Sequence, residues 1–163
     1  MVREGLGEGV GESGAELAAV ETMRRTPQGS LTEVFLSAAR GLVGPGGRDQ
    51  RREVVAEALG YLQEGFGAHY AAGAATDDAI LVGDYAYALA VETIARLDEP
   101  RFVGVASRMI RDGAGEISRG GAVSTSLWTP HLAQLLGIIS GEDENRSEER
   151  IRAAIEEVKS VGG

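Results

Sequence analysis

Three aspartates are the residues of this 163-residue chain whose types and spacing first suggest chemistry. Asp77 and Asp84 are seven residues apart, so a helix would place them on about the same face, roughly 10 Å apart along its axis. Carboxylates at that distance do not share a magnesium ion unless another helix supplies ligands between them. Asp77 and Asp78 are therefore weak metal candidates, and we expect them to complement the dipole of a first helical turn.

Asp84 differs because apolar residues surround it in the sequence ILVGDYAY, residues 80–87. A buried carboxylate requires a partner, since an unpaired charge in the interior is costly. We expect Asp84 to be largely buried and bound by an arginine, a tyrosine hydroxyl or backbone donors of a neighbouring helix. A direct catalytic role is the alternative.

The remaining residue types that could form a catalytic or metal site show no pattern that predicts one. The two histidines, His69 and His131, are 62 residues apart, and no H-E-x-x-H spacing exists, so a paired-histidine metal site is not expected. Cysteine is absent, which removes disulfides, thiolate zinc sites and cysteine nucleophiles. No G-x-S-x-G surrounds a serine, and no predicted strand precedes a glycine dipeptide, which argues against Rossmann and P-loop phosphate sites. We expect no catalytic residue.

Composition and charge narrow the possible partners. The net charge of −9 repels nucleic acid, which binds proteins chiefly through lysine and arginine. No run approaches the ~20 apolar residues of a membrane span, so none is expected. The first residues, MVREGLGEGVGESG, lack the basic start and apolar core of a secretory signal. The expected location is the cytoplasm.

Helical spacing of apolar residues runs through most of the chain, and no strand alternation occurs. Residues 1–15 form a Gly- and Glu-rich arm, and residues 16–163 a single helical domain. Ser30-Leu-Thr-Glu33 is a capping box, and Gly44-Pro45-Gly46-Gly47 is a helix breaker. The predicted helices cover about residues 15–25, 30–42, 49–70, 76–98, 100–117, 129–140 and 145–158. The expected fold is an all-α bundle of six or seven helices with short links.

Three segments, in order, resemble the trans-polyprenyl diphosphate synthases, members of the class I isoprenoid synthases. The run AILVGDYAYALA (79–90), followed by ETIARLDEP (92–100), resembles that family's LAGDYL…GNPE helix. IRDGAGE (110–116) resembles the end of the next helix, and GGRDQRR (46–52) is similar to the G-G-K-R-x-R-P loop. Together they cover about residues 44–120, which implies a half-length isoprenoid-synthase-like bundle.

The resemblance implies roles for particular residues. Arg48, Arg51 and Arg52 match the loop that binds the diphosphate of isopentenyl diphosphate, and their forked donors suit one shared anion. The alternative is that they are surface arginines opening a helix. Asp84 and Glu116 are expected to be buried structural polar residues.

The aspartate-rich motifs D-D-x-x-D of the family are missing. Leu81 stands where an acid should follow Asp77-Asp78, and no second motif follows Glu116. The expected function is therefore that of a non-catalytic accessory subunit, bound to a catalytic prenyl synthase subunit as a heteromer. One alternative is a homodimeric binding protein on the same scaffold. The other is an active prenyltransferase with an unconventional magnesium site formed from Asp77, Asp78, Asp84, Asp112 or Glu116; no cofactor is expected otherwise.

The predicted helix over 76–98 is apolar almost all round, which is typical of a helix in the middle of a bundle. Complete coverage of such a helix is hard to achieve with six or seven short helices. We therefore expect it, or the neighbouring helix over residues 102–117, to contribute to an apolar subunit interface.

Overall fold

The computed structural model describes residues 30–42, 50–71, 77–121 and 123–162. The N-terminal arm (1–15), the helix expected over 15–25 and Arg48 lie outside these residues. The described residues form six helices and no strand, which confirms the all-α prediction. The helices are α2 (Leu31–Ala38), α3 (Arg51–Ala71), α4 (Asp77–Ala95), α5 (Pro100–Ser118), α6 (Thr125–Ser140) and α7 (Glu144–Gly162). None of these helices is long and apolar enough to cross a membrane.

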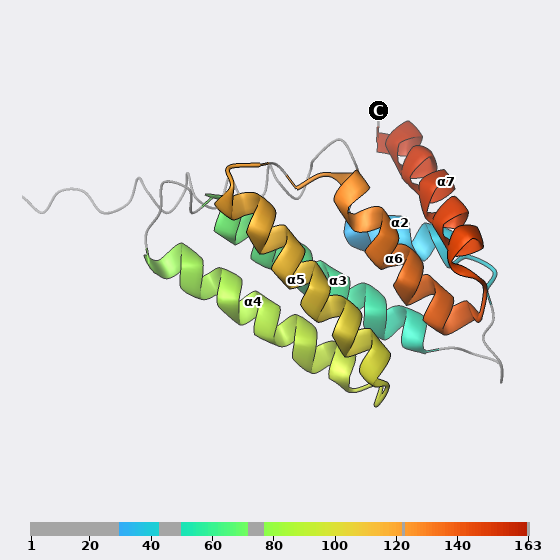
Figure 1. Cartoon of the computed structure of the whole chain (residues 1–163), viewed down its shortest axis with the longest axis horizontal. Helices are drawn as coiled ribbons and strands as arrows, with labels where there is room; N and C mark the ends of the chain where they lie inside the picture. The colour runs from blue at the N-terminus through green and yellow to red at the C-terminus, as the bar shows by residue number, and fades with distance from the viewer. Residues whose placement is uncertain (1–29, 43–49, 72–76, 122, 163) are drawn as a thin grey trace, which may run out of the picture.

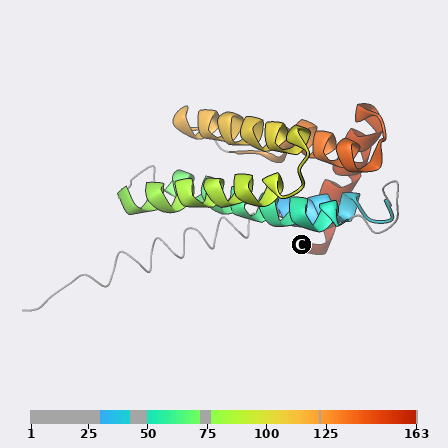
Figure 2. The same cartoon turned by 90° about the horizontal axis from the view of Figure 1, so that it is seen from below.

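Two layers make up the bundle. Figure 2 shows α3 and α4 side by side in one layer, with α5 and α6 in the other. At one end α7 packs against both α2 and α6 (Figure 1). The contact between α2 and α7 joins distant parts of the sequence. In it, the Ser37 hydroxyl donates a hydrogen bond of 2.8 Å to the carboxylate of Glu157, 120 residues away. Arg40 adds an ion pair to the same carboxylate at 3.1 Å.

Local signals set most of the helix ends. Ser30 and Glu33 form the predicted capping box, each side chain accepting from the other residue's backbone N–H. Glu99 caps α5, and Pro100 occupies its first turn, where a missing N–H costs little. Gly141 ends α6 with a φ of 74°, a left-handed conformation that glycine adopts without strain.

Two predicted helix starts are wrong. α6 begins at Thr125 rather than Thr129, so Pro130 lies inside the helix, and the Thr129 hydroxyl donates to the Thr125 carbonyl. Pro130 has no N–H to donate to the carbonyl four residues earlier, and its neighbours Thr129 and His131 are buried. α7 begins at Glu144, and the Asp143 carboxylate, not the predicted Asn145, accepts from the backbone N–H of Arg146.

A core of apolar side chains lies between the two layers and continues to α2 and α7. Its largest fully buried members come from all six helices: Phe35, Leu59, Leu62, Ile94, Phe102, Met109, Leu132, Leu135, Leu136, Ile139 and Ile151. Phe66 of α3 stacks on Trp128 of α6, with ring centroids 4.6 Å apart. Gly113 of α5 admits this pair, because a Cβ there would lie 2.4 Å from the Phe66 ring. The core therefore ties the layers together, whereas one side of α4 is not covered by any of the described residues.

Candidate functional site

The position of α4 differs from the prediction of a central helix. Among the described helices, α3 and α5 make the main contacts with it, so it lies at the edge of the bundle that they form (Figure 1). Leu81, Val82 and Tyr85 are 64%, 62% and 67% exposed. The reason is that periodicity shows an apolar helix surface but not how many neighbours are available to cover it. We call the exposed residues Ile80, Leu81, Val82, Tyr85 and Ala88 the α4 outer face.

The opposite side of α4 fits closely against α3 through two glycines. A Cβ at Gly65 would lie 2.4 Å from the Tyr87 ring, and one at Gly83 would lie 2.5 Å from the His69 ring. The rings of His69 and Tyr87 stack with centroids 5.0 Å apart. Burial raises the pKa of Tyr87, and the Asp84 carboxylate adds to the rise. The glycines thus allow the aromatic side chains to fill the space between the helices.

The predicted burial of Asp84 and Glu116 is wrong. Asp84 is 63% exposed and accepts a hydrogen bond of 3.1 Å from Nε2 of His69. Gly83 takes the inward position, so the next residue lies at the edge of the helix contact. Glu116 is half-buried and pairs with Arg119 one turn along α5, at 2.7 Å. Both carboxylates are paired, but through partners that the sequence did not indicate.

The other predicted site residues that the structure describes are not brought together. Asp77 and Asp78 are exposed in the first turn of α4. In the described part of the chain, no three histidine or acidic side chains are grouped so that they could hold a metal ion. Arg51 donates to the carbonyl of Ile139 in α6 at 3.3 Å, whereas Arg52 binds its neighbour Glu53. The three-arginine diphosphate site stays a prediction, since Arg48 lies outside the described residues.

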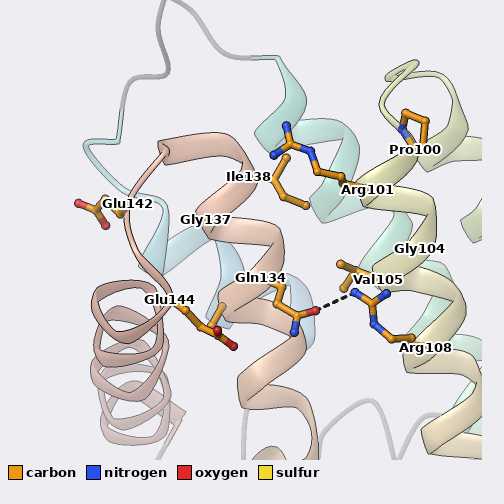
Figure 3. Close-up of a pocket in the computed structure, with 11 residues that line it drawn as sticks. Pro100, Arg101, Gly104, Val105, Arg108, Gln134, Gly137, Ile138, Glu142 and Glu144 are labelled. Carbon is orange, nitrogen blue, oxygen red and sulfur yellow. Dashed lines mark hydrogen bonds between the residues drawn. The ribbon is translucent and has the colours of Figure 1, made fainter.

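A groove of about 570 Å³ crosses the surface between α5 and α6. Arg101 and Arg108 of α5 lie along one side, and Gln134 and Gly137 of α6 along the other (Figure 3). Nη2 of Arg108 donates to Oε1 of Gln134 at 2.9 Å. The groove has the size of a small-molecule site, although no sequence motif points to it.

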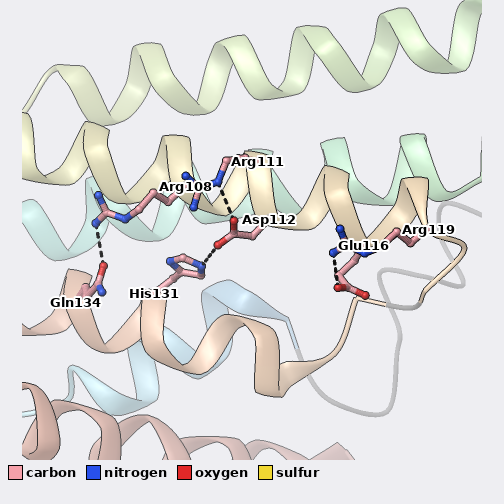
Figure 4. A network of polar contacts seen from close by, with 7 residues as sticks. All are labelled: Arg108, Arg111, Asp112, Glu116, Arg119, His131 and Gln134. Atoms are coloured by element: carbon pink, nitrogen blue, oxygen red, sulfur yellow. Dashed lines mark hydrogen bonds and ion pairs between the residues drawn. The ribbon is translucent and has the colours of Figure 1, made fainter.

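A second polar pair lies nearby between the same helices. Nε2 of His131 lies 2.9 Å from Oδ2 of Asp112, whose Oδ1 accepts from Arg111 (Figure 4). These contacts, that of Arg111 first, hold the pKa of Asp112 below its usual value. Nδ1 of His131 is buried without a hydrogen-bond partner among the described residues.

Sequence reasoning missed both histidine–aspartate pairs and the groove. Each pair joins two helices, and its members lie only 15 and 19 residues apart. Antiparallel helices joined by a short link would bring such residues together, so the spacing was a usable signal. Comparison of the chain with known protein families, with curated proteins and with solved structures finds no match.

Proposed function

We propose that this protein is a non-catalytic helical subunit that works by binding another protein chain through the α4 outer face. The expected partner is the catalytic subunit of a long-chain polyprenyl diphosphate synthase. The observation that carries the proposal is the exposure of Leu81, Val82 and Tyr85 on one helix. Adjacent exposed apolar side chains of this size are typical of protein-binding surfaces, whereas single ones are common anywhere.

The composition of this face supports a protein partner rather than a small molecule. Tyr85 at its centre is an aromatic anchor of the kind that dominates binding energy at interfaces. Leu81 and Val82 precede it by four and three residues, so the three form one patch on the helix surface. The three segments that resemble prenyl synthases supply the expected identity of the partner. This proposal assigns the chain no cofactor.

Co-expression with a catalytic polyprenyl synthase subunit tests this proposal. The wild-type chain should co-purify with it, and the paired substitution Leu81→Glu and Tyr85→Glu should abolish the complex. Val161→Glu is the matched control, because Val161 is 83% exposed on α7 and away from α4. Retained complex in the double variant, with unchanged helix content by circular dichroism, would contradict the role of the α4 outer face. Magnesium-dependent release of pyrophosphate from an allylic diphosphate by the chain alone would contradict the non-catalytic role.

A second candidate, a homodimer formed through α4, is favoured by the charges at the two ends of that helix. Asp77 lies in the first turn and Arg96 just beyond the last, about 28 Å apart at 1.5 Å per residue. In an antiparallel pair, a register that puts Tyr85 of one copy beside Ala88 of the other also puts Asp77 beside Arg96. One two-fold axis therefore satisfies both the apolar and the charged contacts.

Charge reversal tests this dimer. Asp77→Arg alone and Arg96→Asp alone should each weaken self-association measured by sedimentation equilibrium, because each creates like charges at the helix ends. The double variant should restore it, since the pair is then exchanged. A monomeric wild type leaves only the heteromeric proposal, and failure of the double variant to recover excludes this register.

A further inference from the structure

The groove between α5 and α6 carries a glycine on each side. On α5, Gly104 lies three residues after Arg101 and four before Arg108. On α6, Gly137 lies one turn beyond Gln134 (Figure 3). Residues at such spacing share one helix face, so two cationic side chains flank Gly104, and a Cβ there would have only the Arg108 guanidinium near it, at 3.5 Å.

The charge of Arg108 is not neutralised by a carboxylate in the described part of the chain. Its guanidinium donates to the neutral amide oxygen of Gln134, at 2.9 Å. Other arginines of this acidic protein are bound to acids, as Arg150 is to Glu142 and Arg119 to Glu116. A guanidinium held in place by an amide keeps its remaining N–H donors and its full charge for another group.

Neighbouring arginines add to the positive potential at this end of the groove. Arg101 uses Nε and Nη2 on Glu99, which leaves Nη1 for a further acceptor. The guanidinium of Arg51 lies close enough to repel Arg101 electrostatically. In a chain of net charge −9, Arg51, Arg101 and Arg108 place three guanidinium groups near one groove, and Arg101 forms an ion pair with Glu99.

The rest of the groove limits what fits. Val105, Ala133 and Ile138 provide apolar surface beside the arginines. The Glu142 carboxylate at the far end is held by two bonds of 2.8 Å from Arg150, which lowers its pKa and keeps it ionised. The Glu144 carboxylate also lines this end. We therefore expect an anionic group at the arginine end rather than beside the two acids.

We infer that this groove binds a small organic oxyanion, with its phosphate or carboxylate on Arg108 and Arg101 and a compact apolar body on Val105, Ala133 and Ile138. Guanidinium groups bind both oxyanions through paired N–H donors, and the groove volume lies within the range of small-molecule sites. The site is separate from the α4 outer face and does not depend on the function proposed above.

Titration of the isotope-labelled chain, followed by amide NMR shifts, tests the inference. The probes are inorganic phosphate, phenyl phosphate and benzoate. Phenyl phosphate or benzoate should shift the amides of Gly104, Arg108 and Gly137, and the tighter of the two identifies the oxyanion. Inorganic phosphate should bind more weakly because it lacks the apolar body. Shifts spread over arginines elsewhere, no shifts at millimolar probe, or equal affinity for inorganic phosphate and both aromatic probes would overturn the proposal.

Two variants and a control make the test specific. Arg108→Gln should weaken binding of the better aromatic probe about tenfold or more, as expected for loss of a charged hydrogen bond. Gly104→Leu should narrow the groove beside Arg108, because the atom nearest to a Cβ there is Nη1 of the flexible Arg108 side chain, at 3.5 Å; an unchanged circular dichroism spectrum should accompany the loss of binding. Arg152→Gln makes the same charge change on α7, where Arg152 is exposed and does not line the groove, and it should leave affinity unchanged. Equal weakening by Arg152→Gln, or unchanged binding in both groove variants, would contradict the site.

Discussion

The two histidine–aspartate pairs place the same chemical groups in two different surroundings. His69–Asp84 joins α3 to α4 at the edge of the bundle, where the carboxylate is mostly in water. His131–Asp112 joins α5 to α6, where the imidazole is only 8% exposed. The bond lengths, 3.1 and 2.9 Å, are nearly equal. Burial, not geometry, therefore decides how much each pair contributes, because water screens an exposed pair and replaces its lost bonds.

The largest expected effect is that of His131→Ala. It removes a buried ring that lies near Trp128, and it takes a hydrogen-bond donor from Asp112. The free energy of unfolding, measured in urea, should fall by about 2–4 kcal/mol. A loss no greater than that of the matched change His69→Ala would contradict the role given to burial.

Gly65→Ala tests how closely α3 and α4 fit. Its new methyl group would meet the Tyr87 ring, which is buried and cannot move aside. We expect a destabilisation of about 1–3 kcal/mol by thermal or urea unfolding, although alanine favours the helix itself. Gly83→Ala is the matched variant, and it should cost less because the partly exposed His69 ring can rotate away. The reverse order would show that the His69 contact is the more rigid one.

The acid limb of stability should depend on Asp112. Because its folded-state pKa is lowered, its contribution is complete above the unfolded value of 3.8 and is lost as the pH falls through the folded value. Asp112→Asn should therefore flatten the fall in unfolding free energy at acidic pH. Arg111→Gln should flatten it in part, since Arg111 is the main cause of the shift. Parallel pH profiles for the wild type and Asp112→Asn would contradict this linkage.

The smallest expected effect is that of His69→Ala. The variant loses the bond to an exposed carboxylate and the stacking on Tyr87, which together should amount to about 1 kcal/mol. The measurement is the same urea titration, so the two histidines are compared directly. A loss of unfolding free energy larger than that of Gly65→Ala would indicate that water does not screen the His69–Asp84 pair, contrary to what its exposure suggests.

The sequence predicted where the helices lie along the chain better than it predicted which helices pack against one another. Apolar spacing, Ser30, Pro100 and Gly141 determine helical segments and ends locally, so the all-α fold followed from them. The position of α4 at the edge of the bundle did not follow from the sequence, because an apolar helix has the same spacing of apolar residues whether neighbours cover one side of it or both. Asp84 was misplaced for the same reason: its exposure depends on how α3 docks, which is a tertiary property.

The candidate sites were less predictable than the fold. The groove depends on two glycines and two arginines that carry no motif, and their convergence requires the packing of α5 on α6. The histidine–aspartate pairs require the register of antiparallel helices. Single-sequence reasoning supplies residue types and faces, whereas register is set by side-chain fit such as that of Gly83 against His69.

The bond from Ser37 to Glu157 has a consequence for the order of folding. The helix pairs α3–α4 and α5–α6 join segments that are close in sequence, so little chain entropy is lost when they form. The α2–α7 contact closes a loop of 120 residues. Its formation therefore costs chain entropy that is offset only once the core between the two helices has formed. We therefore expect the contact between α2 and α7 to form late, after the transition state, so that Ser37→Ala would speed unfolding and leave the refolding rate almost unchanged.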